Sequence, residues 1–176
     1  FKKKFNLDIE CFGSFFNHTL KYYFGIFPDL EKYFGCLGNF YDSKFIRGFY
    51  IVNPPYTSDH ILNSLNHLLE MLKKSNKELY FLFVIPAWVY KDRINLNKQC
   101  KDKVKIQKYK GDYNNIMNSL KKSKYLNKYL LYCKENYKFY SYLTEQEAKV
   151  APINLILISN QKKNIDIESI FGNPDI

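Results

Sequence analysis

Cysteine and histidine are scarce in this 176-residue chain, and their spacing argues against a zinc-binding domain and against a disulfide-stapled domain. Only three histidines are present, and the four cysteines, at Cys11, Cys36, Cys100 and Cys133, are far apart and form no Cys-x-x-Cys pair. Zinc sites and disulfide-stapled domains both need closely patterned cysteines. We therefore expect no metal site and no disulfide framework, and the cysteine usage fits a reducing compartment.

Long apolar stretches are also missing. The longest one spans residues 79–90 and contains Pro86, whereas a membrane-spanning helix needs about 20 apolar residues. The opening Phe-Lys-Lys-Lys-Phe lacks the apolar core of a signal peptide. Internal repeats and Gly/Ser-rich linkers are absent as well. We expect no membrane association and a single domain over residues 1–176, cut from a longer chain.

Acidic residues are outnumbered by basic ones, 17 against 27, which gives a formal net charge of +10. Every basic residue except Arg47 and Arg93 is a lysine. A surplus of this size favours polyanionic partners such as RNA or DNA. The high content of Lys, Asn, Ile, Tyr and Phe is also what A/T-rich coding produces, so function and codon bias are both consistent with the charge.

What the chain does contain is an alternation of strand and helix patterns. Residues 48–52 and 79–85 are runs of β-forming apolar residues, typical of buried strands. Between them, after a cap at Thr57 or Ser58, apolar residues recur at the spacing of a helix, at Ile61, Leu65, Leu68, Leu69 and Leu72. A strand, a helix and a strand in this order predict a parallel pair and an α/β fold.

The remaining segments give weaker patterns. We expect helices at residues 15–24 and 113–132 and a loop at residues 27–38. We expect strands at residues 103–109, 138–143 and 153–159. The last two strands are joined by too few residues for a crossover helix, which predicts an antiparallel hairpin. A mostly parallel sheet that ends in such a hairpin is the shape of the Rossmann-like class I S-adenosylmethionine-dependent methyltransferases, by analogy of fold.

The most informative motif is Asn53-Pro54-Pro55-Tyr56, between a buried strand and a helix. Loops at the carboxyl ends of parallel strands face the crevice in which α/β sheets bind ligands. The Asn53 side-chain oxygen and the Pro54 carbonyl can each accept one hydrogen of an exocyclic amine, which localises the nitrogen lone pair for attack on a methyl group. The prolines fix the local backbone, and Tyr56 offers an aromatic face to a flat base, worth about 1–3 kcal/mol.

The same four residues admit other interpretations. Asn-Pro-Pro can simply end a strand, with Tyr56 filling a gap. Among enzymes, methylation of adenine in RNA or DNA and methylation of a protein glutamine amide both present a planar NH2 group to such a tetrapeptide. A catalytically inactive relative that keeps the fold as an RNA-binding or scaffold subunit is a further alternative.

Other motifs extend the pattern along the chain. They are Glu10-Cys11-Phe12-Gly13-Ser14 followed by Asn17, Phe27-Pro28-Asp29, Tyr33-Phe34-Gly35, Val52-Asn53-Pro54-Pro55-Tyr56 and Val84-Ile85-Pro86-Ala87-Trp88. In this order and spacing the chain resembles the cap-specific adenosine N6-methyltransferases, also called phosphorylated CTD-interacting factors, over about residues 7–160 and most strongly up to Trp88. The resemblance implies methylation of the N6 of a 2′-O-methyladenosine next to the mRNA cap, with S-adenosyl-L-methionine as cofactor.

The resemblance also assigns residues and partners. Asn53, Pro54, Pro55 and Tyr56 form the catalytic motif that holds the base, and Asn53 also borders the cofactor. The cofactor-binding residues of the first strand and loop are Glu10, Cys11, Phe12, Gly13, Ser14 and Asn17. Implied partners are capped mRNA and, through regions outside these residues, the RNA polymerase II tail, without membrane or metal. The family acts in the nucleus, and a cytoplasmic version would have the same sequence features.

Three further positions complete the expected site. Asp29, or else Glu31, lies about 20 residues beyond the first loop, where a carboxylate can accept ribose hydroxyls of the cofactor. Trp88 follows a buried strand and either walls the base pocket or serves packing. Ala87 stands where the resemblance leads us to expect an acidic residue. The lysine-rich stretch 98–110 is a candidate phosphate-binding surface or else a solvated strand edge.

Overall fold

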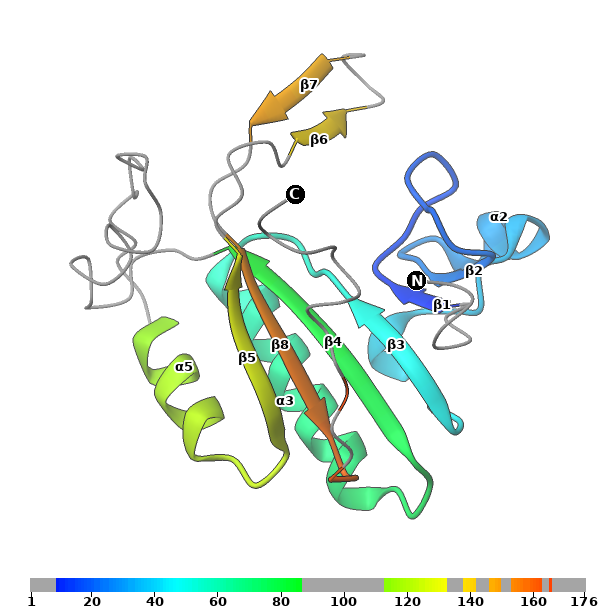
Figure 1. The fold of residues 1–176 in the computed structure, drawn as a ribbon. Coiled ribbons are helices and arrows are strands. Elements are labelled where there is room, and N and C mark those ends of the chain that lie inside the picture. Colours follow the sequence, from blue (N-terminus) through cyan, green and yellow to red (C-terminus); the bar gives the residue numbers. More distant parts are fainter. Residues whose placement is uncertain are drawn as a thin grey trace.

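The computed structural model describes residues 9–86, 113–132, 138–141, 146–149, 153–162 and 165. Its main feature is a six-stranded sheet with two longer helices on one face (Figure 1). The strands of this sheet are β1 (Ile9–Cys11), β2 (Tyr22–Phe24), β3 (Gly48–Val52), β4 (Leu79–Pro86), β5 (Leu126–Tyr132) and β8 (Ile153–Ser159). The helices are α2 (Pro28–Glu31), η1 (Lys32–Phe34), η2 (Phe40–Asp42), α3 (Ser58–Lys74) and α5 (Tyr113–Lys122), and a second sheet pairs β6 (Lys138–Ser141) with β7 (Gln146–Lys149).

The strand order of the main sheet is β2-β1-β3-β4-β8-β5. β1 is paired in parallel with both β2 and β3, and β3 is paired in parallel with β4. β8 runs antiparallel to both of its neighbours, β4 and β5. The predicted α/β class is therefore confirmed, and the sheet is mixed.

The elements with the strongest sequence patterns form where they are predicted. β3 covers residues 48–52, and β4 continues one residue past the predicted end to include Pro86. α3 begins after Thr57, whose hydroxyl oxygen accepts a hydrogen bond from the His60 N–H at 3.4 Å. The apolar stripe of α3 is buried against the sheet, except for the half-buried Leu69.

The sheet has a hydrophobic core on each face. On the face covered by α3 and α5, Leu68 and Met117 pack over Phe81 of β4. On the other face, alternate residues of the same strands, such as Leu82 of β4 and Leu157 of β8, form a second cluster. Because β4 and β8 are buried on both faces, both strands are mostly apolar, and Asn154 and Ser159 are the buried polar residues of β8. Burial of each large side chain contributes about 1.5–3 kcal/mol.

Two segments predicted as helices have a different structure. Residues 15–21 form turns, and Tyr22–Phe24 is β2, because these aromatic residues pair with β1. The second predicted helix, over residues 113–132, ends at Lys122, and a turn leads into β5, in which the Leu126 N–H donates to the Ser123 carbonyl at 3.2 Å. The predicted loop over 27–38 contains the short helices α2 and η1. The periodic apolar residues of 113–132 thus divide between a helix and a strand.

The predicted hairpin between residues 138–143 and 153–159 is wrong. β6 pairs with β7, and β8 lies between β4 and β5 in the main sheet. Every residue of β8 is buried, and only a central strand buries apolar side chains on both faces in this way. The strand predicted over 103–109 lies outside the described residues. In the parts of the chain that the structure describes, no helix is long and apolar enough to cross a bilayer.

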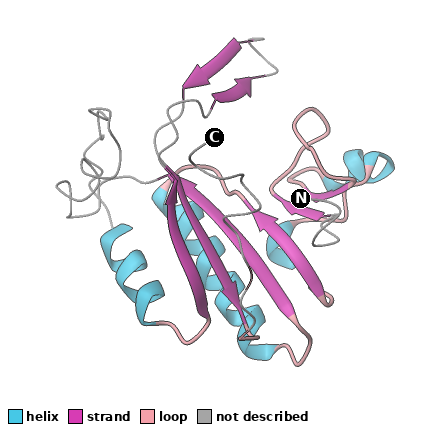
Figure 2. Ribbon diagram, viewed as in Figure 1, coloured by secondary structure: helices cyan, strands magenta, loops and turns pink. Residues whose placement is uncertain are grey.

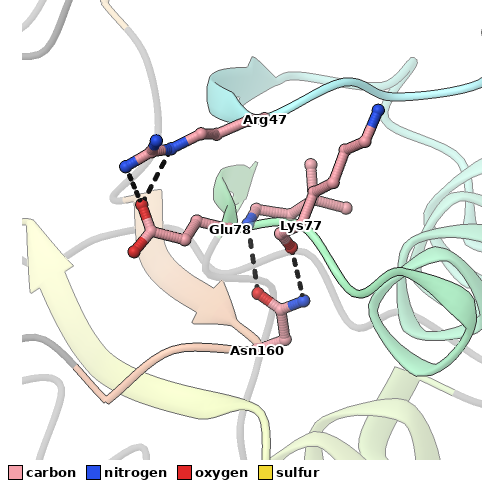
Figure 3. Close-up of polar contacts among 5 residues, drawn as sticks. Arg47, Lys77, Glu78 and Asn160 are labelled. Carbon is pink, nitrogen blue, oxygen red and sulfur yellow. Dashed lines mark hydrogen bonds and ion pairs between the residues drawn. The ribbon is translucent and has the colours of Figure 1, made fainter.

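A polar clamp closes the sheet at the amino end of β4 (Figure 3). The Asn160 side chain accepts a hydrogen bond from the Leu79 N–H at 3.1 Å. Its amide nitrogen donates to the Lys77 carbonyl at 2.7 Å and to the Ser75 carbonyl at 3.2 Å. Beside it, Nε and Nη2 of Arg47 donate to Oε2 of Glu78 at 2.9 and 2.6 Å. These bonds join β3, the α3–β4 turn and the residue that follows β8.

Candidate active site

The loops that follow β1 and β3 leave the sheet side by side. These strands are parallel neighbours, and Cys11 is paired with Val52 at their carboxyl ends. The next residues are Phe12 in one loop and Asn53 in the other, on strands about 4.8 Å apart. Figure 2 shows both loops in pink where they continue from the sheet. Two of the predicted motifs therefore meet at the edge at which α/β sheets bind ligands.

The Asn53-Pro54-Pro55-Tyr56 segment is a short link between β3 and α3. Pro54 is buried, Pro55 is exposed, and Asn53 and Tyr56 are half-buried. The Thr57 N–H donates to the Pro55 carbonyl at 2.8 Å, and Thr57 also caps α3, so the end of the link is fixed to the helix. Tyr56 is thus neither fully exposed nor part of the hydrophobic core.

Oδ1 of Asn53 is the unusual atom of this link. It is buried, and no described residue donates a hydrogen bond to it. An unpaired buried acceptor costs about 1–3 kcal/mol of folding free energy. Such atoms are rare in folded proteins and call for a specific explanation. A ligand that brings an N–H donor to this position would supply the missing hydrogen bond.

The loop after β1 turns sharply against β2. Phe12 has a φ of 91°, a left-handed conformation that is rare for a bulky residue. The N–H groups of Phe12 and Gly13 both donate to the Phe24 carbonyl, at 3.2 and 2.9 Å. A Cβ atom on Gly13 would lie 2.6 Å from Cβ of Tyr23. The close approach that glycine permits here is therefore to the Tyr23 side chain.

Glu10 and Cys11, at the end of β1, use their side chains within the protein. Oε2 of Glu10 accepts hydrogen bonds from the N–H and Oγ1 of Thr19, at 3.1 and 2.9 Å, which closes the β1–β2 connection. The Cys11 side chain is 1% exposed and belongs to the core beneath α3. Burial, and then the Glu10 charge, raise the pKa of the Cys11 thiol well above its ordinary value. The thiol is therefore protonated at neutral pH and is a poor nucleophile.

Ser14 and Asn17 form the tip of the loop after β1. The Asn17 N–H donates to the Ser14 carbonyl at 3.0 Å, and the same carbonyl lies 2.8 Å from Nδ1 of His18. The His18 ring stacks on Tyr23 of β2, with ring centroids 4.6 Å apart. Asn17 itself is exposed. A hydrogen bond from its side chain to a cofactor stays a prediction.

Of the two candidate carboxylates, Glu31 faces the loop after β1 and Asp29 does not. Asp29 is exposed, whereas Glu31 is buried and its Oε1 accepts a hydrogen bond from the Phe15 N–H at 3.0 Å. Oε2 of Glu31 is also buried, with no donor among the described residues. It lies so close to Gly25 that an added Cβ atom would collide with it. Burial, and then the Glu31 charge, raise the pKa of Tyr23.

The other predicted site positions lie outside the described residues. These are Trp88, Ala87 and the lysine-rich stretch 98–110. Within the described ranges, no three His, Cys, Asp or Glu side chains form a group that could hold a metal ion. Sequence reasoning missed Thr19 as the partner of Glu10, because a threonine nine residues after a glutamate belongs to no local pattern.

Comparisons with known proteins identify a matching family and two similar proteins. The family described as "Phosphorylated CTD interacting factor 1 WW domain" matches residues 1–116 of the 176. Over 84 residues, 48% of the chain, the sequence is 32% identical to a Mus musculus protein and to a Homo sapiens protein, each named mRNA (2'-O-methyladenosine-N(6)-)-methyltransferase. The aligned part is 12% of the length of each relative. The family match includes β1 to β4 and α3, and therefore both loops of the candidate site.

Proposed function

Because the chain belongs to the phosphorylated CTD interacting factor 1 WW domain family, we propose that it is an S-adenosylmethionine-dependent methyltransferase acting on the N6 of adenosine in RNA. The proposed substrate is the 2′-O-methyladenosine next to the mRNA cap, the nucleoside in the names of its mouse and human relatives. In this proposal residues 1–176 are a single methyltransferase domain with a Rossmann-like core, which works in the nucleus. Contacts with the RNA polymerase II tail belong to regions outside this chain.

The observation that carries the proposal is the unpaired acceptor of Asn53. The atom is buried at the carboxyl end of a parallel strand, beside the loop after β1. An adenine N6 amine has two hydrogens to donate, and one of them would supply the bond that Oδ1 lacks. A strand end with a purely structural role more commonly has a water-exposed or hydrogen-bonded side chain, which avoids this cost.

The residues of the link have complementary tasks in the proposed reaction. Asn53 Oδ1 and the Pro54 carbonyl accept the two amine hydrogens, which draws the nitrogen lone pair out of conjugation with the ring. Pro54 and Pro55 fix φ near −65° and remove two N–H groups that would compete for the acceptors. The ring of the half-buried Tyr56 stacks on the base. Positioning and electrostatics of this kind can supply several kcal/mol of barrier reduction without a dedicated base.

The carboxylate of Glu31, at the end of α2, supports the proposed cofactor. S-adenosylmethionine carries ribose hydroxyl donors, and the buried Oε2 of Glu31 is an acceptor that lacks a donor among the described residues. When bound, the cofactor supplies a methyl group on a sulfonium sulfur. The neutral Cys11 thiol does not compete for that methyl group.

A methyl-transfer assay with labelled S-adenosylmethionine tests this function directly. The full-length protein is incubated with capped RNA that begins in 2′-O-methyladenosine, with the same RNA beginning in guanosine, with adenine-containing DNA and with a glutamine-containing protein extract. We expect label only in the first RNA, at N6. Label in DNA or protein but not in RNA would contradict the proposal. Cofactor binding without transfer to any substrate would instead indicate an inactive relative.

A further inference from the structure

A second candidate site lies toward the opposite end of the sheet from Asn53, at the start of β5. It is a groove of about 370 Å³ between the start of β5 and the segment that follows β8. The residues that line it are Lys124, Leu126, Asn127, Lys128, Leu157, Lys162 and Ile165. Neither the predicted motifs nor the proposed reaction uses any of these side chains.

The groove is basic. Lys124 and Lys128 come from the start of β5, and Lys162 comes from a segment more than 30 residues later. No acidic side chain is among the described residues that line it. The convergence of three lysines from two segments is therefore a property of the fold and not only of the composition.

A β-bulge gives the groove its shape. Leu126 pairs with Ile158 and Lys128 with Leu157, so Asn127 is an extra residue in β5. The bulge puts Leu126 against the core beneath α5, while Lys128 lines the groove together with Leu157. The Asn127 Nδ2 donates to the Gln161 carbonyl at 2.7 Å, which ties the two walls together. Bulges at sheet edges commonly re-aim side chains in this way.

The groove also has apolar surface. Leu157 of β8 is fully buried and forms the floor, and the half-buried Ile165, which packs against the second hydrophobic cluster, contributes to the lining. A ligand that matches this surface carries regularly spaced negative charges beside less polar sugar or base surfaces. Lysine neutralises phosphates without reading bases, and release of counterions makes such binding favourable. An RNA strand has this chemistry along its whole length.

We propose that this groove binds the phosphate backbone of an RNA strand, away from the nucleotide that is methylated. β5 is antiparallel to β8, and β8 is antiparallel to β4, so the start of β5 lies at the amino end of β4. The Asn53 link follows Val52, which pairs with Phe83, so it lies closer to the carboxyl end of β4, and β4 and β8 separate it from β5 by about 14 Å across the sheet. One strand of RNA that occupies both places must therefore extend several nucleotides beyond the target. Only the choice of RNA as the polyanion rests on the proposed function.

Binding of an RNA that cannot be methylated separates this proposal from the proposed function. The probe is a fluorescent oligouridine of about 20 nucleotides, without cap or adenosine, titrated with the full chain over a range of salt concentrations. The groove variant is Lys124→Gln, Lys128→Gln and Lys162→Gln together. The matched control is Lys44→Gln, Lys73→Gln and Lys77→Gln, which removes the same charge from exposed positions outside the groove.

We expect the groove variant to bind oligouridine about tenfold more weakly or worse, and its salt slope to fall by about 2, since each phosphate contact on a single strand contributes about 0.7. The control variant should keep most of the affinity and slope. Equal losses in the two variants, or no loss in either, would overturn the proposal. Polyglutamate that competes as well as unlabelled oligouridine would show a general polyanion site and overturn the assignment to RNA. Absence of methyl transfer in the assay above leaves these outcomes unchanged.

Discussion

Asn53 and Asn160 occupy opposite ends of the same sheet, and their side chains are in opposite states. Asn160 uses both its amide oxygen and its amide nitrogen, in three hydrogen bonds to the α3–β4 turn. Asn53 has a buried amide oxygen that no described residue pairs. One end of the sheet is therefore complete within the protein, and the other has hydrogen-bonding capacity that a ligand would satisfy. The comparison leads us to predict that substitutions at the Asn160 end change stability alone, and that substitutions at the Asn53 end change the proposed function.

The largest expected effect is at the incomplete end. Asn53→Ala should reduce methyl transfer at least about 100-fold, because it removes an acceptor that orients the reacting amine. Its thermal stability should change little or increase, since no described hydrogen bond is lost. Asn63→Ala, at an exposed position of α3, is the control and should leave both quantities unchanged. Activity and melting temperature are measured on the same samples. A melting temperature of Asn53→Ala well below that of the wild type would show that Asn53 has a structural role instead.

The next effect combines stability and function at that same end. Gly13→Ala should destabilise the protein by about 1–3 kcal/mol, because its Cβ would overlap Cβ of Tyr23 and displace the loop after β1 from β2. Cofactor affinity should fall as well, since that loop borders the proposed site. Gly48→Ala is the matched control, because the added Cβ would make only ordinary contacts of 3.6 Å or more. Chemical denaturation and calorimetric cofactor titration measure the two effects, and equal behaviour of the two alanine variants would contradict this prediction.

At the complete end, Asn160→Ala should lower stability without touching the chemistry. The change removes the hydrogen bonds to the Leu79 N–H and the Lys77 carbonyl, with an expected cost of about 1–2 kcal/mol. For a protein of this size the melting temperature falls by about 2–4 °C per kcal/mol. At a temperature where the variant is fully folded, its rate of methyl transfer should equal that of the wild type. A slower rate of methyl transfer under those conditions would contradict the prediction that Asn160 affects stability alone.

The smallest expected effect is that of the ion pair beside this clamp. The Arg47 side chain is 72% exposed, so its pairing with Glu78 is screened by water and salt. Arg47→Gln should cost less than about 1 kcal/mol. The difference from the wild type should shrink further when denaturation is repeated at high salt. A cost that stays large at high salt would show that the guanidinium packs against the turn in some other way.

The sequence predicts the centre of the sheet better than its edges. β3, α3 and β4 form as predicted because their patterns are long and end at residues that stop an element, and they place Asn53 at a strand end. β5 was predicted as helix because no glycine or proline marks the turn before it. The hydrogen bond between Glu31 and the Phe15 N–H, and the meeting of Lys162 with Lys124 and Lys128, depend on contacts between distant segments that no local pattern contains.

One binding measurement tests the central claim, that Asn53 Oδ1 accepts a hydrogen bond from the target amine. Wild type and Asn53→Ala are each titrated with two capped RNAs that differ only in the first nucleoside, 2′-O-methyladenosine or the same purine without its amine. The account predicts that the wild type binds the amine-bearing RNA up to about tenfold more tightly, the value of one good hydrogen bond, and that Asn53→Ala binds both RNAs equally. If Asn53→Ala preferred the amine-bearing RNA by the same factor as the wild type, the claim that Asn53 Oδ1 accepts this hydrogen bond would be contradicted.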